Sequence, residues 1–181
     1  AEMLHRSGQD LLAAYVAVAV AASSSKVNID PSIAYTAGLV HDLGKIVIAH
    51  ALDDPTQAAM RELIARKESS LVEAEKRILG TDHAEVGECL LRKWGLPELV
   101  LESVANHHKP VLQPQPQLSA IVHVADAIAH EVGASPGWAS YAMRVDENAV
   151  AALGLGRADI ERLTISGYDA LHQVEEIVAS I

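Results

Sequence analysis

The octapeptide GLVHDLGK, residues 38–45, places three ionisable side chains inside an otherwise apolar segment. His41 and Asp42 stand side by side, and adjacent residues of a helix diverge by about 100°, so both can reach one ion from neighbouring directions. Lys45 follows one turn after His41, points the same way and would suit a phosphate oxygen. For the doublet on its own, a solvated or capped pair is an equally good interpretation.

Four further residues of the same chemical types follow along the chain. His83 lies in the first turn of an expected helix, His107 and His108 end another, and Asp126 lies among small and apolar neighbours in IVHVADAIAH. Each has an ordinary explanation: exposure for His83, the helix dipole for the His pair, and a backbone hydrogen bond for Asp126. Unpaired charges in apolar surroundings are costly, however, and groups on separate helices can converge only in a helical core. A bound cation would account for all of them together.

The donor types restrict the metal. Imidazole and carboxylate without thiolate suit one or two divalent ions of Fe, Mn, Zn or Ni, with Mg as an option for the carboxylates. Cys89 is the single cysteine, which excludes a disulfide framework and a cysteine-based zinc site.

The composition predicts that helices position these residues. Half of the 181 residues are hydrophobic, mainly Ala, Val, Leu and Ile, and aromatic residues make up only 3%. This composition favours helix over strand, and there is no alternating strand pattern. We therefore predict an all-α fold, a compact helical bundle forming a single domain over residues 1–181.

Capping signals divide the chain into helices. Asp30-Pro31 opens a helix that carries the His41-Asp42 doublet in its middle, and Asp146 and Ser166 are expected to cap the last helices. The expected helices cover residues 3–22, 31–51, 54–67, 70–80, 81–95, 97–108 and 118–132.

Charge and hydropathy exclude two classes of partner. A net charge of −10 argues against a nucleic-acid binder, which needs a basic face to neutralise phosphates. The longest apolar run, residues 11–22, is too short to span a bilayer, and we interpret it as a buried helix rather than a targeting segment. A reducing, cytoplasmic location fits the lone cysteine.

Three segments together resemble the HD superfamily of metal-dependent phosphohydrolases, most closely its HDOD branch. They are AGLVHDLGKIVI (37–48), GTDHAEVGECLLRKWGLPELVLESVANHHKP (80–110) and LSAIVHVADAIAH (118–130). The resemblance implies an HD-type helical bundle in which the doublet and the late aspartate are metal ligands. It also implies that further histidines bind a second metal, and that the lysine after the doublet assists phosphate chemistry. The implied ligands are His41, Asp42, His83, His107, His108 and Asp126, with Asp42 and Lys45 as the catalytic pair.

The chain departs from the family pattern at three places. The family's earliest ligand is a histidine on the first helix; alignment on Ser7 puts that position on Arg6, and His5, one residue earlier, is kept as a candidate. The segment after His108, KPVLQPQPQ, has no G-x-G-Y-P signature, which argues against hydrolysis of cyclic di-GMP of the HD-GYP type. The chain also begins almost at the first-helix element, so we expect it to lack the N-terminal helical half usual in HDOD proteins.

Two functions fit this pattern. One is an output or adaptor domain of bacterial signal transduction, with another signalling protein or domain as its partner and a His/Asp metal site. The alternative is a metal-dependent phosphohydrolase or phosphodiesterase acting on a nucleotide or another phosphate-containing small molecule. We expect neither nucleic acid nor membrane as a partner, and the sequence leaves the oligomeric state open.

Overall fold

The computed structural model describes residues 2–65, 70–110, 118–133 and 145–179, with side chains from residue 8 onward. Within these ranges the regular structure is entirely helical, as the composition predicted. The helices are α1 (Glu2–Ser23), α2 (Pro31–Val40), α3 (Leu43–Ala51), α4 (Asp54–Ala65), α5 (Leu71–Leu79), α6 (His83–Lys93), α7 (Glu98–Asn106), α8 (Leu118–Val132), α9 (Glu147–Ala152) and α10 (Arg157–Ala179).

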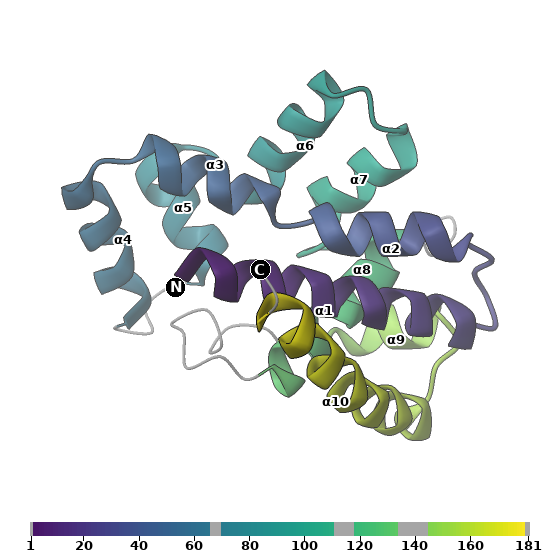
Figure 1. Ribbon diagram of the computed structural model, residues 1–181. Helices are drawn as coiled ribbons and strands as arrows, with labels where there is room; N and C mark the ends of the chain where they lie inside the picture. The colour runs from purple at the N-terminus through teal and green to yellow at the C-terminus, as the bar shows by residue number, and fades with distance from the viewer. Residues whose placement is uncertain (1, 66–69, 111–117, 134–144, 180–181) are drawn as a thin grey trace.

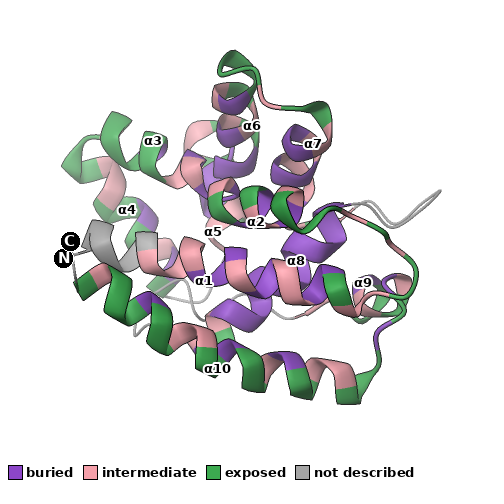
Figure 2. Ribbon diagram, turned by 45° about the vertical axis from the view of Figure 1, so that its right-hand side comes forward, coloured by how far each residue is buried: buried purple, intermediate pink, exposed green. Residues whose placement is uncertain are grey.

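Helix α8 lies at the centre of the bundle. It contacts α1, α2, α7, α9 and α10, and almost all of its side chains are buried (Figure 2). Large apolar residues such as Ile121 and Ile128 are fully enclosed there. Helices α3 to α7 form a second group along one side of α1 and α2 (Figure 1), and a smaller apolar cluster around Met60 and Ile64 joins α4 to α5. A polar side chain buried on α8, such as Asp126, therefore lies where several helices meet.

Several helix boundaries follow the expected capping chemistry. The Asp30 carboxylate accepts a hydrogen bond from Ser32 N at the start of α2, and Ser70 with Glu73 forms a complete capping box on α5. Asp146 caps α9, as predicted. The expectation for Ser166 is wrong, because α10 runs without interruption through this residue. The cap of α6 is Asp82, one residue after the start of the helix expected over residues 81–95.

None of the described helices combines the length and the hydropathy that a transmembrane span requires.

Candidate metal centre

The His41-Asp42 doublet forms the turn between α2 and α3, which corrects the expectation of one continuous helix through both residues. Asp42 has φ −102° and ψ 8°, outside the helical range, and serves as the N-cap position of α3. The break turns the chain so that both side chains point inward: His41 is fully buried and Asp42 is 7% exposed.

A close approach of α3 to α6 holds this turn in place. A Cβ atom on Gly44 would lie 1.9 Å from the carbonyl oxygen of His83 and 2.8 Å from the backbone nitrogen of Gly87. Only glycine fits against the α6 backbone at that distance. The contact brings the start of α6, and with it His83, next to the doublet.

His83 begins α6 and is buried, so its expected position in the first turn is confirmed but the exposed alternative is wrong. Its Nδ1 lies 2.6 Å from the Oε2 atom of Glu75, which also accepts a hydrogen bond from the His83 backbone nitrogen at 2.9 Å. Its Nε2 points the other way, 2.7 Å from Nε2 of His108.

The end of α7 contributes two adjacent imidazoles. His107 is fully buried, and its Nδ1 lies 2.7 Å from the carbonyl oxygen of Val104. Its ring packs against the rings of His41, His83 and His108, with centroids 5.0, 5.6 and 3.9 Å away. Four imidazoles from three separate segments therefore meet at one point.

Asp126 on α8 completes the far side of the cluster and is fully buried. Its Oδ1 lies 3.3 Å from Nε2 of His41 and 3.0 Å from Nδ1 of His130. His130 thus orients the aspartate, whereas His123 contacts the His107 carbonyl at 2.8 Å and accepts from the Asp146 backbone nitrogen at 3.1 Å. One of the two histidines flanking Asp126 in sequence supports it, and the other joins α8 to neighbouring loops.

The ligand atoms fall into sets that share residues. One set joins Asp42 to the three imidazoles of His83, His107 and His108 within 4.8 Å of one another, and a second contains His41, His107 and Asp126. The Oδ1 atom of Asp42 faces His83 and His107 at 3.5 and 3.6 Å, while Oδ2 faces His41 at 3.5 Å. The two oxygens of Asp42 thus face different donor sets, and Asp42 would be a ligand in either set.

Asp10 on α1 is a third carboxylate beside the centre, and the sequence analysis missed it. It groups with His41 and Asp42 within the same 4.8 Å limit. Asp10 lies on the buried stripe of α1, in register with Ala13, Ala14 and Ala17, and an acid on an apolar stripe was the available signal. His5 also lies in α1, but its side chain is outside the described residues, so the expectation for it stays a prediction.

Several buried polar atoms of the cluster lack a hydrogen-bond partner among the described residues. They include His41 Nε2, His107 Nε2, Asp42 Oδ1 and both carboxylate oxygens of Asp126. The Nδ1 atoms of His41 and His107 lie 2.7 Å from the carbonyl oxygens of Gly38 and Val104, and because a carbonyl only accepts, each Nδ1 carries a proton. In the neutral rings Nε2 then keeps a lone pair, so acceptors face acceptors across the centre. Such a group of orphaned acceptors fits a divalent cation.

The pKa shifts of the cluster indicate an excess of negative charge at the centre. Burial disfavours the charged ring, but the Asp42 and Asp126 carboxylates raise the pKa of His41 to about 10. Burial together with the neighbouring Asp42 raises the pKa of Asp10 to about 7. Burial opposes ionisation of Asp126, yet the nearby His41 and His130 hold its pKa well below the usual value. Without a metal the centre therefore retains protons, which a cation would displace.

Lys45 lies at the mouth of the centre. Its ammonium group forms an ion pair with Asp42, and its side chain is 15% exposed. Burial opposes its charge, but Asp42 and Asp126 raise its pKa, so it stays protonated. Lys45 and His108 both line a groove with a volume of ≈ 470 Å³ that opens between α5 and the end of α7. Lys45 therefore contacts the Asp42 carboxylate and also lines the groove.

The HDOD domain profile matches residues 2–110, more than half of the chain. The chain belongs to the HDOD family. The fold of this HDOD chain is also found in a crystal structure of an HDOD domain protein with unknown function from Geobacter sulfurreducens. The two share 22% identity and a TM-score of 0.64, over 95% of this chain and 60% of that one.

Two further relatives extend the comparison. The crystal structure of the MmoQ response regulator from Methylococcus capsulatus has a TM-score of 0.64 and 22% identity, over 91% of the HDOD chain and 62% of that protein. Ribonuclease Y of Opitutus terrae is 31% identical over 105 residues, which are 58% of the HDOD chain and 14% of the ribonuclease. The HDOD chain thus spans only a small part of the length of this relative.

Proposed function

We propose that this HDOD chain is a signal-transduction domain built around a divalent metal centre. The observation that supports the metal is the set of buried acceptors without hydrogen-bond partners, contributed by His41, Asp42, His107 and Asp126. Leaving each such group unpaired would cost about 1–3 kcal/mol, and a cation offsets this cost for all of them at once.

The donor set fits one or two ions of Fe, Mn, Zn or Ni. His83, His107 and His108 with Asp42 would hold one ion, and His41 and Asp126, with Asp10 and Asp42, would hold the other. When bound, such an ion lowers the pKa of a water molecule and stabilises negative charge on a phosphoryl oxygen. Asp42 is placed to serve both positions.

Support for a signalling role comes from the family and from one relative. The MmoQ protein that shares the fold is a response regulator. We therefore propose another signalling protein or domain as the partner of this chain, with the metal centre as a structural or sensing element. A cytoplasmic location agrees with this role.

Metal analysis of the protein purified without oxygen tests the proposal. We expect about two equivalents of divalent metal in the parent and none in Asp42→Ala, because Asp42 faces both donor sets. Asp169→Asn, an exposed carboxylate on α10, is the matched control and should keep the parental metal content. A parent that holds no metal and takes up none of Fe, Mn or Zn would contradict the proposal.

A second candidate function, metal-dependent phosphohydrolase, is favoured by the groove that reaches the centre. Lys45 and His108 line this groove of ≈ 470 Å³, so a phosphate group can approach the cluster from solvent. Lys45 would bind a phosphate oxygen with its ammonium group, while Asp42 anchors the metal site. The name of the ribonuclease Y relative agrees with phosphodiester chemistry. The net charge of −10 favours a small nucleotide over nucleic acid as the substrate.

Turnover separates the two functions. A phosphodiesterase would hydrolyse bis(p-nitrophenyl) phosphate or a small nucleotide diester in the presence of Mn²⁺ or Fe²⁺. Lys45→Ala should then lower turnover by about 100-fold while leaving the metal content at the parental value. Full metal loading without hydrolysis of any of these diesters would leave the signalling function as the supported one.

A further inference from the structure

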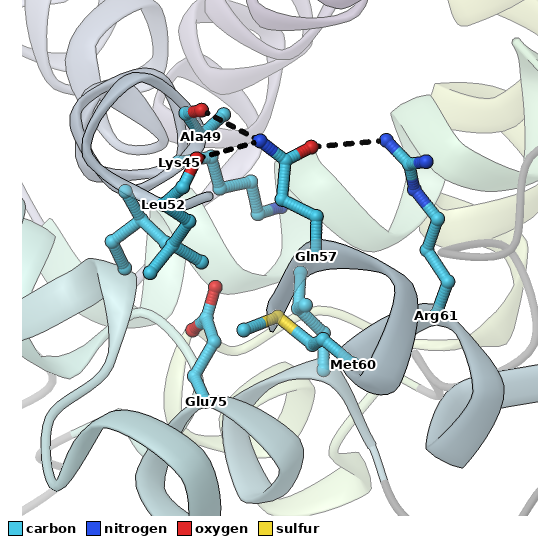
Figure 3. Close-up of a pocket in the computed structure, with 9 residues that line it drawn as sticks. Lys45, Ala49, Leu52, Gln57, Met60, Arg61 and Glu75 are labelled. Carbon is cyan, nitrogen blue, oxygen red and sulfur yellow. Dashed lines mark hydrogen bonds between the residues drawn. The ribbon is translucent and has the colours of Figure 1, made fainter. Parts of the chain in front are cut away.

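Glu75 on α5 is a buried carboxylate beside the metal centre. It is 2% exposed, and one oxygen, Oε2, accepts from both the backbone nitrogen and the Nδ1 atom of His83, at 2.9 and 2.6 Å. Figure 3 shows the carboxylate rising from α5 toward Lys45 and Leu52 of the α3 segment. Glu75 therefore contacts a residue of the donor set without belonging to any set itself.

The two contacts fix both the position and the protonation of the His83 ring. An ionised carboxylate only accepts hydrogen bonds, so Nδ1 carries the proton and Nε2 keeps its lone pair. That Nε2 faces His108 at 2.7 Å and Asp42 at 3.5 Å. The lone pair of Nε2 thus points into the centre, toward His108 and Asp42.

The other buried histidines of the centre are supported differently. In His41 and His107 the Nδ1 proton goes to a backbone carbonyl three residues earlier. A carboxylate draws the proton more strongly than a carbonyl, which makes the opposite ring nitrogen a better electron-pair donor. Among these three rings, His83 is the one whose Nδ1 proton goes to a carboxylate.

The surroundings of Glu75 strengthen its hydrogen bonds. Its side chain lines a small cavity of ≈ 50 Å³ with the apolar Leu52 and Met60 and with the polar Lys45, Gln57 and Arg61 (Figure 3). Because Glu75 is almost fully buried, its charge-assisted hydrogen bonds are stronger than they would be in water. The contact of 2.6 Å with the His83 imidazole is therefore a strong one.

We infer that Glu75 is a positioning residue that prepares His83 to bind metal through Nε2 and makes the histidine-rich half of the centre the tighter of the two. This inference rests on the metal centre of the proposed function. Glu75 itself would not be a ligand, because it lies outside the donor sets.

The first test uses the metal-free protein, so its outcome does not depend on metal binding. Long-range ¹H–¹⁵N spectra of the imidazoles should show His83 protonated at Nδ1 in the parent and in Glu75→Gln, whose amide oxygen still accepts. Glu75→Ala should show a mixture of the two tautomers. A parent protonated at Nε2, or an unchanged tautomer in Glu75→Ala, would overturn the inference.

The second test titrates each protein with Co²⁺, whose absorption reports the ligands. We expect Glu75→Gln to weaken the first, tighter binding step by 10–100-fold, because it keeps the shape but removes the negative charge. Glu88→Gln, a carboxylate on α6 that pairs with Arg92 away from the centre, should bind like the parent. Equal affinity in Glu75→Gln and the parent would show a purely structural role for Glu75. A parent that binds no Co²⁺ would overturn the metal centre and this inference together.

Discussion

Nε2 of His41 lies 3.3 Å from the Oδ1 atom of Asp126, and both side chains are fully enclosed. The Nδ1 proton of the same ring is already directed to the Gly38 carbonyl. Two buried acceptors therefore face each other across α2 and α8, an arrangement that requires either an additional proton or a cation between them.

This relationship predicts a selective loss of metal when Asp126 is neutralised. Asp126→Asn removes a carboxylate from the set that contains His41 but leaves the three-histidine set intact. We expect the metal content to fall from about two equivalents to about one, measured by elemental analysis after gel filtration. Loss of both ions would contradict the division of the centre into two halves.

Asp10 should act as a ligand of the same half. Asp10→Asn replaces a charged donor with a neutral one next to His41, and we expect the affinity for the weaker ion to fall by at least about 10-fold in a Mn²⁺ titration. In the metal-free protein the same change should raise the free energy of unfolding at pH 8 by about 1–3 kcal/mol, since a buried carboxylate with a raised pKa is costly to ionise. Gln9→Ala on the same helix should leave the Mn²⁺ affinity unchanged. An unchanged affinity in Asp10→Asn would exclude Asp10 as a ligand.

The stability of the metal-free protein should fall as the pH rises. The pKa of Asp10 is raised from 3.8 to about 7, so the native state binds more protons than the unfolded state between these values and loses stability through this range. The pKa of His41 is raised from 6.5 to about 10, and its contribution is present below pH 6.5 and lost toward pH 10. Asp42 and Asp126 have lowered pKa values and lose their contribution only below about pH 4.

Urea unfolding in the presence of EDTA at pH 5, 7 and 9 measures this dependence. We expect the highest free energy of unfolding near pH 5 and a steady decrease at the two higher values. The gain in free energy of unfolding on adding Mn²⁺ should increase with pH and be largest at pH 9. Metal binding requires that His41 and Asp10 lose their protons. A stability that increases from pH 5 to pH 9 without metal would contradict the assignment.

The contact between Gly44 and α6 should tolerate no side chain. The methyl group of Gly44→Ala would overlap the His83 carbonyl, so α3 and α6 must separate, and we expect a loss of about 3 kcal/mol in the free energy of unfolding. The separation also moves His83 away from Asp42, so metal should be lost from the histidine-rich half. Thermal unfolding and metal analysis test both effects.

Gly8→Ala is the matched control for this substitution. A Cβ on Gly8 of α1 would meet Val174 and Val178 of α10 at 3.7 Å, an ordinary van der Waals contact. We expect this variant to be equally stable or more stable by about 0.5–1 kcal/mol, with unchanged metal content. If Gly44→Ala had the same free energy of unfolding and the same metal content as Gly8→Ala, neither property would require the close packing of α3 on α6.

The sequence by itself determined the helical class, the family and most of the residues that meet in the centre. Ala-rich amphipathic segments with strong caps favour helix locally, and His83, His107, His108 and Asp126 are unusual enough within such segments to be recognised individually. The residues that form the centre were therefore predictable by type, while their distances were not.

Only the tertiary structure decided where the chain turns and which further acids join the centre. The break at His41-Asp42 follows from the packing of Gly44 on α6, a contact between residues far apart in the sequence that overrides local helix propensity. Asp10 and Glu75 each lie on an apolar helix face, where the sequence alone does not distinguish a ligand from a tolerated charge. Burial depends on the neighbouring helices, so the functional surroundings of these two carboxylates arise only once the bundle has assembled.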